Sequence, residues 1–336
     1  GTLGICAIFA AMCGISGAAV VAMGTIALPS MLERGYDKRM VLGCINTGGG
    51  WGILIPPSIL MILYSLITGV SVGQMFAAGV LPGILLMVLT CIYIIVRCYF
   101  QPHLAPALPK DERASWREKM LALRAVILPI IIVVVTLGSI IAGVTTPTEA
   151  AAVGVFGALV SALVYRKFSW ELMRDASIRT FKLTGMIMWI LFAAHAFSAA
   201  YQSMGAQELI EGMITGIPGG PWAVIITMMV IVFFLAMVLD PVGIMLITLP
   251  VFLPIVQSMG FDPVWFGILF VINMEIGYMT PPFGFNLFYL KGVVPPSITM
   301  KDIYVSVIPF VLVEIVGLAL IMIFPEIATY LPDLMF

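Results

Sequence analysis

Charged residues are scarce in this chain of 336 residues. Only 10% of the residues are Asp, Glu, Lys or Arg, against about 25% in soluble domains, whereas 62% are hydrophobic. This composition excludes an ordinary soluble domain and predicts an integral membrane protein that lies in the lipid bilayer. The net charge of −1 argues neither for nor against nucleic acid, and no other feature predicts such a partner.

Residues that commonly bind transition metals are also few. The five cysteines are odd in number and show no C-x-x-C spacing, and the only histidines are His103 and His195. We therefore expect no metal site of that kind and no cofactor.

Alternating strand patterns are absent, whereas apolar runs near or above 20 residues recur along the chain. Runs of this length are typical of membrane-spanning helices, so the sequence predicts an all-α polytopic membrane protein. The chain begins Gly-Thr-Leu without an initiator Met and shows no secretory signal pattern. We expect it to be the C-terminal part of a longer protein.

Two stretches interrupt long apolar segments with glycine and Pro-Pro. They are GGGWGILIPPS at 48–58 and GYMTPPF at 277–283. Proline lacks an N–H and clashes with the preceding helical turn, so each stretch predicts a membrane helix that is broken near its centre. Broken backbone at membrane depth is tolerated only where protein buries it or a cavity lies beside it. Paired breaks in two halves of a chain indicate a transporter's binding site.

Each broken segment follows a predicted re-entrant hairpin. The first occupies 2–30 with its turn at 13–17, and the second occupies 222–258 with its turn at 239–241. At an offset of 225 residues the two halves share identities at structural breakers. The pairs are Leu28/Leu253, Pro29/Pro254, Gly35/Gly260, Asp37/Asp262, Gly52/Gly277, Pro56/Pro281, Pro57/Pro282 and Tyr64/Tyr289. We interpret the halves as repeats.

The basic residues predict the orientation of these repeats. All 16 Lys and Arg lie in four clusters, at 34–39, 97–124, 166–182 and 291–301, and basic loops prefer the cytoplasmic side. Placing every cluster inside makes the first hairpin enter from the cytoplasm and the second from outside. The repeats are then inverted, as in many secondary transporters.

The predicted organisation has four parts. They are residues 1–68 and 222–290, which hold the two hairpins and broken helices of the transport unit, 69–221 for connecting and scaffold helices, and 291–336 for a final scaffold helix and tail. Ordinary spans are expected at about 74–97, 121–143, 147–165, 183–203 and 303–324, and a charged helix at 166–182 on the membrane surface.

Four motifs in order resemble the large membrane subunit of tripartite ATP-independent periplasmic (TRAP) transporters. They are GWGILIPPS, TTPTEAA at 145–151, FDPVWFG at 261–267 and GYMTPPFGFNLF at 277–288. The resemblance implies sodium-coupled uptake of a small organic acid by an elevator motion across the bacterial inner membrane. It also implies two partners, a small membrane subunit and a periplasmic substrate-binding protein.

The same resemblance implies where sodium binds. In that family sodium lies between each hairpin and the neighbouring broken helix. The matching positions are Ser16, Gly52, Ile55 and Pro57 in the first half, and Leu239, Asp240, Gly277, Thr280 and Pro282 in the second. The first hairpin tip, CGISGA, has fewer serines than many family members.

The residue chemistry of these positions agrees with sodium. Unwound carbonyl groups at 52–55 and 277–280 supply hard oxygen ligands, to which Ser16 and Thr280 add hydroxyl groups. Two alternatives stay open: the Ser16 hydroxyl bonding its own helix backbone, and Asp240 acting as an N-cap before Pro241.

Other ionisable residues are weaker candidates. Glu275 and Glu314 lie inside spans, where such residues are functional hypotheses by default, but neither the repeat nor the family motif includes them. We interpret Glu149 as part of a capping box with Thr146. His195 has no nearby acid in the sequence and is interpreted as a packed histidine.

No Lys or Arg lies in the predicted membrane centre. A carboxylate substrate would then be held by bound cations and by the N-termini of half-helices that start near Ser58 and Phe283. Further hydrogen bonds are expected from polar residues near the breaks. The substrate candidates are Asn46, Thr47, Ser58, Asn273 and Asn286.

Three alternatives to a binding-protein-dependent permease follow from the same residues. The nearest is a sodium–anion symporter that works without a binding protein, and a channel is a second. The third is an intramembrane hydrolase using Ser16 and His195, which lacks an activating third group. We expect no enzyme.

Overall fold

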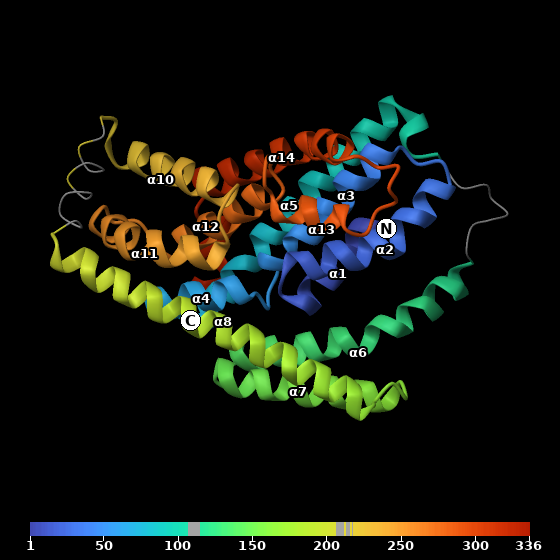
Figure 1. Ribbon diagram of the computed structural model, residues 1–336, viewed down its shortest axis with the longest axis horizontal. Helices are drawn as coiled ribbons and strands as arrows, with labels where there is room; N and C mark the ends of the chain where they lie inside the picture. The colour runs from blue at the N-terminus through green and yellow to red at the C-terminus, as the bar shows by residue number, and fades with distance from the viewer. Residues whose placement is uncertain (107–114, 206–211, 213–215, 217) are drawn as a thin grey trace.

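The computed structural model describes residues 1–106, 115–205, 212, 216 and 218–336. Every regular element in these ranges is a helix, so the predicted all-α class is confirmed (Figure 1). The predicted loops at 100–118 and 204–221 lie partly outside the described residues.

The helices follow in an order that alternates short and long elements. The first half contains α1 (Thr2–Cys13), α2 (Ser16–Glu33), α3 (Lys38–Gly50), the 3₁₀ turn η1 (Trp51–Ile53), α4 (Ile59–Thr68), α5 (Val72–Phe100) and the 3₁₀ turn η2 (Pro102–Leu104). The middle contains α6 (Trp116–Ile141), α7 (Pro147–Val164) and α8 (Trp170–Ser203). The last part contains α10 (Gly220–Ala236), α11 (Pro241–Ser258), α12 (Pro263–Tyr278), α13 (Phe285–Lys291), α14 (Met300–Ile323) and α15 (Glu326–Met335).

Six helices of the described chain are long and apolar enough to cross a membrane. They are α2, α5, α7, residues Trp170–Ala193 of α8, α11 and α14. Shorter apolar helices include α1, α4, α10 and α12, and these belong to the predicted hairpins and broken segments.

Local chemistry explains where the helices begin and end. The helix α1 ends at Gly14, which has a φ of 65° that glycine adopts without a Cβ penalty. Asp37 and Asp262, one of the matched pairs, each accept a backbone N–H of the helix that follows, at 2.9 Å from Met40 and 2.6 Å from Val264. The predicted capping box of Thr146 and Glu149 is confirmed at the start of α7.

The two halves pack on each other by exchange. The helices α1 and α2 pack on α3, as α10 and α11 pack on α12. In addition α2 contacts α13, and α11 contacts α4. The second helix of each pair therefore reaches the short helix that follows the break in the other half.

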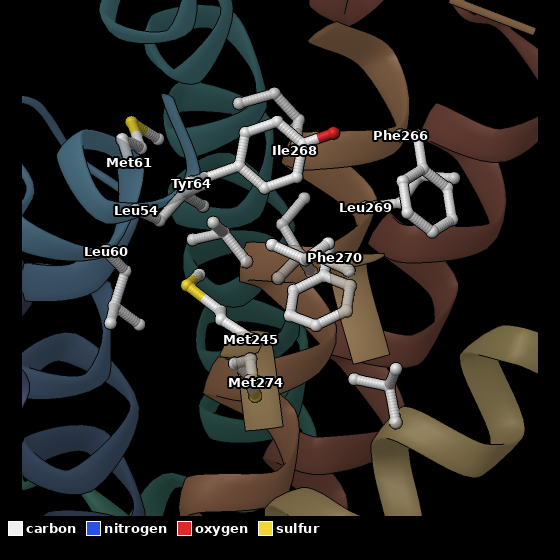
Figure 2. Close-up of a cluster of buried hydrophobic side chains, with 14 of the residues drawn as sticks. Leu54, Leu60, Met61, Tyr64, Met245, Phe266, Ile268, Leu269, Phe270 and Met274 are labelled. Carbon is white, nitrogen blue, oxygen red and sulfur yellow. The ribbon is translucent and has the colours of Figure 1, made fainter. Parts of the chain in front are cut away.

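The core centres on α12, whose residues from Val264 to Tyr278 are all buried. Figure 2 shows its aromatic and aliphatic side chains beside Tyr64 of α4 and Met245 of α11. The Tyr64 hydroxyl donates to the Pro263 carbonyl at 2.6 Å, and a Cβ added to Gly267 would lie 2.6 Å from the Tyr64 ring. Gly267 thus permits close contact between α4 and α12.

The helices α6, α7 and α8 lie along one side of the molecule (Figure 1). Almost none of the spanning part of α7 or α8 is buried within the chain. The helix α8 is continuous from Trp170 to Ser203, so the predicted boundary between a surface helix and a span near residue 183 is wrong. Arg and Lys are good helix formers, and Arg174, Arg179 and Lys182 therefore do not interrupt it.

Candidate functional site

The first break separates α3 from α4. The helix α3 ends in three glycines, the turn η1 follows, and α4 starts only after Pro56-Pro57. Ser58 begins α4 as its N-cap, because its hydroxyl accepts from the Met61 N–H at 3.4 Å and donates to the Ile53 carbonyl.

The turn between α1 and α2 docks on this break through backbone atoms. The Ile59 N–H donates to the Gly14 carbonyl at 3.3 Å. A Cβ added to Gly52 would lie 2.8 Å from the Ile15 oxygen and 3.2 Å from the nitrogen of Ser16. The backbone of the break therefore touches the hairpin turn directly, and Ser16 is buried beside it.

The second break has a comparable contact. A Cβ added to Gly277 would lie 2.3 Å from the Ala236 Cβ, at the end of α10. The carbonyl oxygens of Tyr278 and Thr280 gather at Gly284, where an added Cβ would lie 2.5 and 2.9 Å from them. Glycine at each break thus lets backbone oxygens come close to another chain segment.

A cavity of about 460 Å³ lies between the two hairpin turns. The first half contributes Ser16, Gly17 and Ile53, and the second half contributes Asp240 and Tyr278. Residues 183, 186 and 187 of α8 form another part of the wall. No Lys or Arg is among the lining residues, which are mainly apolar.

The predicted sodium positions divide into two groups. Ser16, Gly52 and Gly277 are buried, and Ile55, Pro57 and Thr280 are half-buried. The exposed positions are Leu239, Asp240 and Pro282. The Thr280 hydroxyl donates to the Ile276 carbonyl, and the Pro282 carbonyl accepts from the Tyr304 hydroxyl at 2.7 Å.

Asp240 has a structural contact at the second turn. Its carboxylate accepts the Val242 N–H at 3.0 Å, with Pro241 at the first position of α11. The proposed N-cap is confirmed, and because Asp240 also lines the cavity, one residue is placed for both roles.

None of the predicted substrate residues lines the cavity between the turns. Thr47 contacts the Met279 sulfur at 3.7 Å, Asn273 donates to the Met229 carbonyl, and Ser58 caps α4. Asn46 and Asn286 are fully buried elsewhere and have no hydrogen-bond partner in the described chain.

Sequence reasoning missed two tyrosines of the cavity. Tyr278 follows Gly277 directly, so its place in the motif was an available signal. Tyr289 lies over Gly17, where an added Cβ would be 2.7 Å from its ring, a contact between residues that are far apart in the sequence.

Ser16 and His195 line different cavities. Ser16 faces the cavity between the turns, whereas His195 lines a second cavity of about 490 Å³ beside α4 and α11. The two side chains therefore do not form a nucleophile–base pair.

Comparison with known proteins identifies the family. Residues 2–327 match the family described as "Tripartite ATP-independent periplasmic transporter, DctM component". A C4-dicarboxylate TRAP transporter large permease protein from Pseudomonas aeruginosa is 35% identical over 333 residues, which cover 98% of this chain and 75% of that protein.

Relatives with other printed substrates match over similar lengths. An ectoine TRAP transporter large permease protein from Halomonas elongata is 32% identical over 340 residues, covering 100% of this chain and 77% of that protein. An isethionate TRAP transporter permease protein from Oleidesulfovibrio alaskensis is 31% identical over 297 residues, covering 87% and 46%. The resemblance drawn from the four motifs is confirmed. The chain is a multi-pass transport protein and not an enzyme, and it belongs to the DctM family of large TRAP permease components.

Proposed function

We propose that this permease takes up a small carboxylate by sodium-coupled transport. The observation that carries the proposal is the cavity of about 460 Å³ between the two hairpin turns, which has no Lys or Arg in its lining. A carboxylate there needs positive charge from another source, and sodium ions held at the breaks supply it. The printed substrates of relatives, C4-dicarboxylate and isethionate among them, favour a small solute.

The sodium positions proposed are those of the two breaks. The carbonyl groups near Gly52 and Gly277, the hydroxyl groups of Ser16 and Thr280, and the Asp240 turn provide oxygen ligands in short segments. The close backbone approaches at both glycines support this assignment.

The transport unit proposed comprises residues 1–68 and 222–290 as two inverted repeats with re-entrant hairpins. The exchanged contacts of α2 with α13 and of α11 with α4 support it, because they join both halves into one body. Residues 69–221 and 291–336 form the scaffold against which this body moves as an elevator.

Two partners complete the proposed system. A small membrane subunit packs with lipid against the uncovered apolar faces of α7 and α8. A periplasmic binding protein delivers substrate to the outer face of the inner membrane. Both partners follow from membership of a tripartite family.

The test is uptake by proteoliposomes that contain both membrane subunits. A radiolabelled C4-dicarboxylate is supplied with or without the cognate binding protein, under an inward sodium gradient or with choline in place of sodium. We expect uptake only with the sodium gradient and the binding protein together. Vigorous sodium-driven uptake of free substrate would favour the symporter that needs no binding protein, and flux without a gradient requirement would favour a channel.

A further inference from the structure

A buried polar cluster lies where α3, α12, α13 and α14 meet, outside the cavity between the turns. Each helix contributes one polar side chain with no exposed surface. They are Asn46 of α3, Glu275 of α12, Asn286 of α13 and Glu314 of α14.

Gly50 at the end of α3 locates the centre of the cluster. A Cβ added there would lie 3.1 Å from Glu275 Oε1 and 3.7 Å from Asn286 Nδ2. Asn46 precedes Gly50 by four residues and so lies on the same face of α3. The Trp51 indole N–H donates to Glu314 Oε1 at 3.1 Å, and the two carboxyl groups are close enough to interact electrostatically.

Most polar atoms of this cluster have no partner. Both oxygens of Glu275, Oε2 of Glu314 and the complete amide groups of Asn46 and Asn286 make no hydrogen bond within the described chain. The ion pair found in the described residues, Lys38 with Asp302, involves neither glutamate. Burial of unpaired carboxylates is costly, so a ligand that satisfies them would stabilise the fold considerably.

The number of free acceptors favours a metal cation over protons. A proton on each glutamate would supply one donor per carboxyl group, whereas the free oxygens come from four side chains that surround one region. A hard cation satisfies several oxygens at once, and two carboxylates offset its charge. The site is small because Gly50 has no side chain.

We propose that Glu275, Asn46 and Asn286 bind a sodium ion, with Glu314 held by Trp51 as an outer carboxylate, at a site separate from both helix breaks. This inference deepens the proposed sodium coupling and rests on it for a role in transport, although binding itself is measured without transport. The position of Glu275 two residues before Gly277 would link occupancy of the buried site to the geometry of the second break.

The experiment is equilibrium binding of ²²Na⁺ to the purified complex of this chain with its small membrane subunit. Glu275→Gln removes one charge with little change in shape, and we expect it to bind about one ion fewer per chain, as loss of a ligand implies. Glu314→Gln should keep the number of ions but weaken one of them by about 10-fold, as loss of outer-shell partners does. The control is Glu326→Gln, the same change at an exposed residue, which should bind as wild type does.

Gly50→Ala provides a second route that keeps every carboxylate. Its added methyl group comes within 3.1 Å of Glu275 Oε1, so sodium affinity should fall while the protein stays folded by thermal unfolding. If Glu275→Gln misfolds, this variant decides the question. Wild-type sodium binding in folded Glu275→Gln or Gly50→Ala, even with an altered pH dependence of stability, would overturn the site and leave the proposed transport intact. A wild-type complex that binds no sodium would overturn both.

Discussion

Glycines at the two breaks are the residues whose size matters most. Gly52 and Gly277 each touch backbone of the neighbouring hairpin, and neither has room for a methyl group. The matched sequence motifs identified both positions, because glycine before Pro-Pro has a strong local meaning. The residues around them were less predictable: Asn46 and Asn286 were expected near substrate, and whether they contact it stays a prediction.

Replacing Gly277 by alanine should weaken sodium coupling. The new Cβ would lie 2.3 Å from the Ala236 Cβ, so the second hairpin turn must move away from the break. We expect the sodium concentration for half-maximal uptake to rise by about 10-fold, which corresponds to about 1.4 kcal/mol. Gly243→Ala is the control, because its added Cβ in α11 meets nothing within 4 Å. Equal sodium dependence of the two variants would remove Gly277 from the site.

Asp240 can be tested for its two roles separately. Asn is as good an N-cap as Asp, so Asp240→Asn should keep the hydrogen bond to the Val242 N–H and melt as wild type does. If the carboxylate also binds sodium, this variant should need more sodium for uptake. Asp240→Ala should lose stability as well. Normal transport by Asp240→Asn would restrict the residue to capping.

At the scale of elements, sequence predicted breaks better than boundaries in charged segments. Gly and Pro change the backbone locally, so the ends of α3 and α12 followed from the residues themselves. The continuity of α8 did not, because charged residues mark solvent or headgroups without ending a helix. The contacts of α2 with α13 and the pairing of Trp51 with Glu314 depend on packing between distant segments, which no local pattern contains.

The opposite orientation of the hairpins makes a labelling prediction. Ser177 in α8 belongs to a basic cluster and Ser258 ends α11 beside a base-free loop. On a background without native cysteines, Ser177→Cys should react with an impermeant maleimide only from the cytoplasm, and Ser258→Cys only from outside. Both sites are exposed and Ser is close to Cys in size. Reaction of both from one face would contradict the inverted arrangement.

At the scale of the whole molecule, the elevator proposal predicts which cross-links stop transport. Met12 of α1 and Ile132 of α6 line a common cavity of about 480 Å³, so they belong to the proposed moving body and to the scaffold. A spacer-length bifunctional thiol reagent joining Met12→Cys to Ile132→Cys should stop uptake, and a reductant that cleaves the spacer should restore it.

The matched control for this cross-link joins two scaffold helices. A Cβ added to Gly154 of α7 would lie 3.4 Å from Thr136 Oγ1 of α6, so Thr136→Cys with Gly154→Cys should cross-link as well. Uptake should continue, because both residues stay fixed together. Full uptake with the first pair joined would argue for local gating around a stationary site.

The exchanged packing of the two halves has an evolutionary consequence. Gly17 of α2 lies under the Tyr289 ring, and a Cβ added to Gly24 would lie 2.8 Å from the Val293 side chain. A larger residue on one side must therefore be accompanied by a smaller one on the other, so the duplicated halves are expected to diverge in concert. A chimera that takes residues 1–68 from a relative and keeps the remainder would inherit mismatched partners at this seam, whereas exchanging both halves together would preserve them.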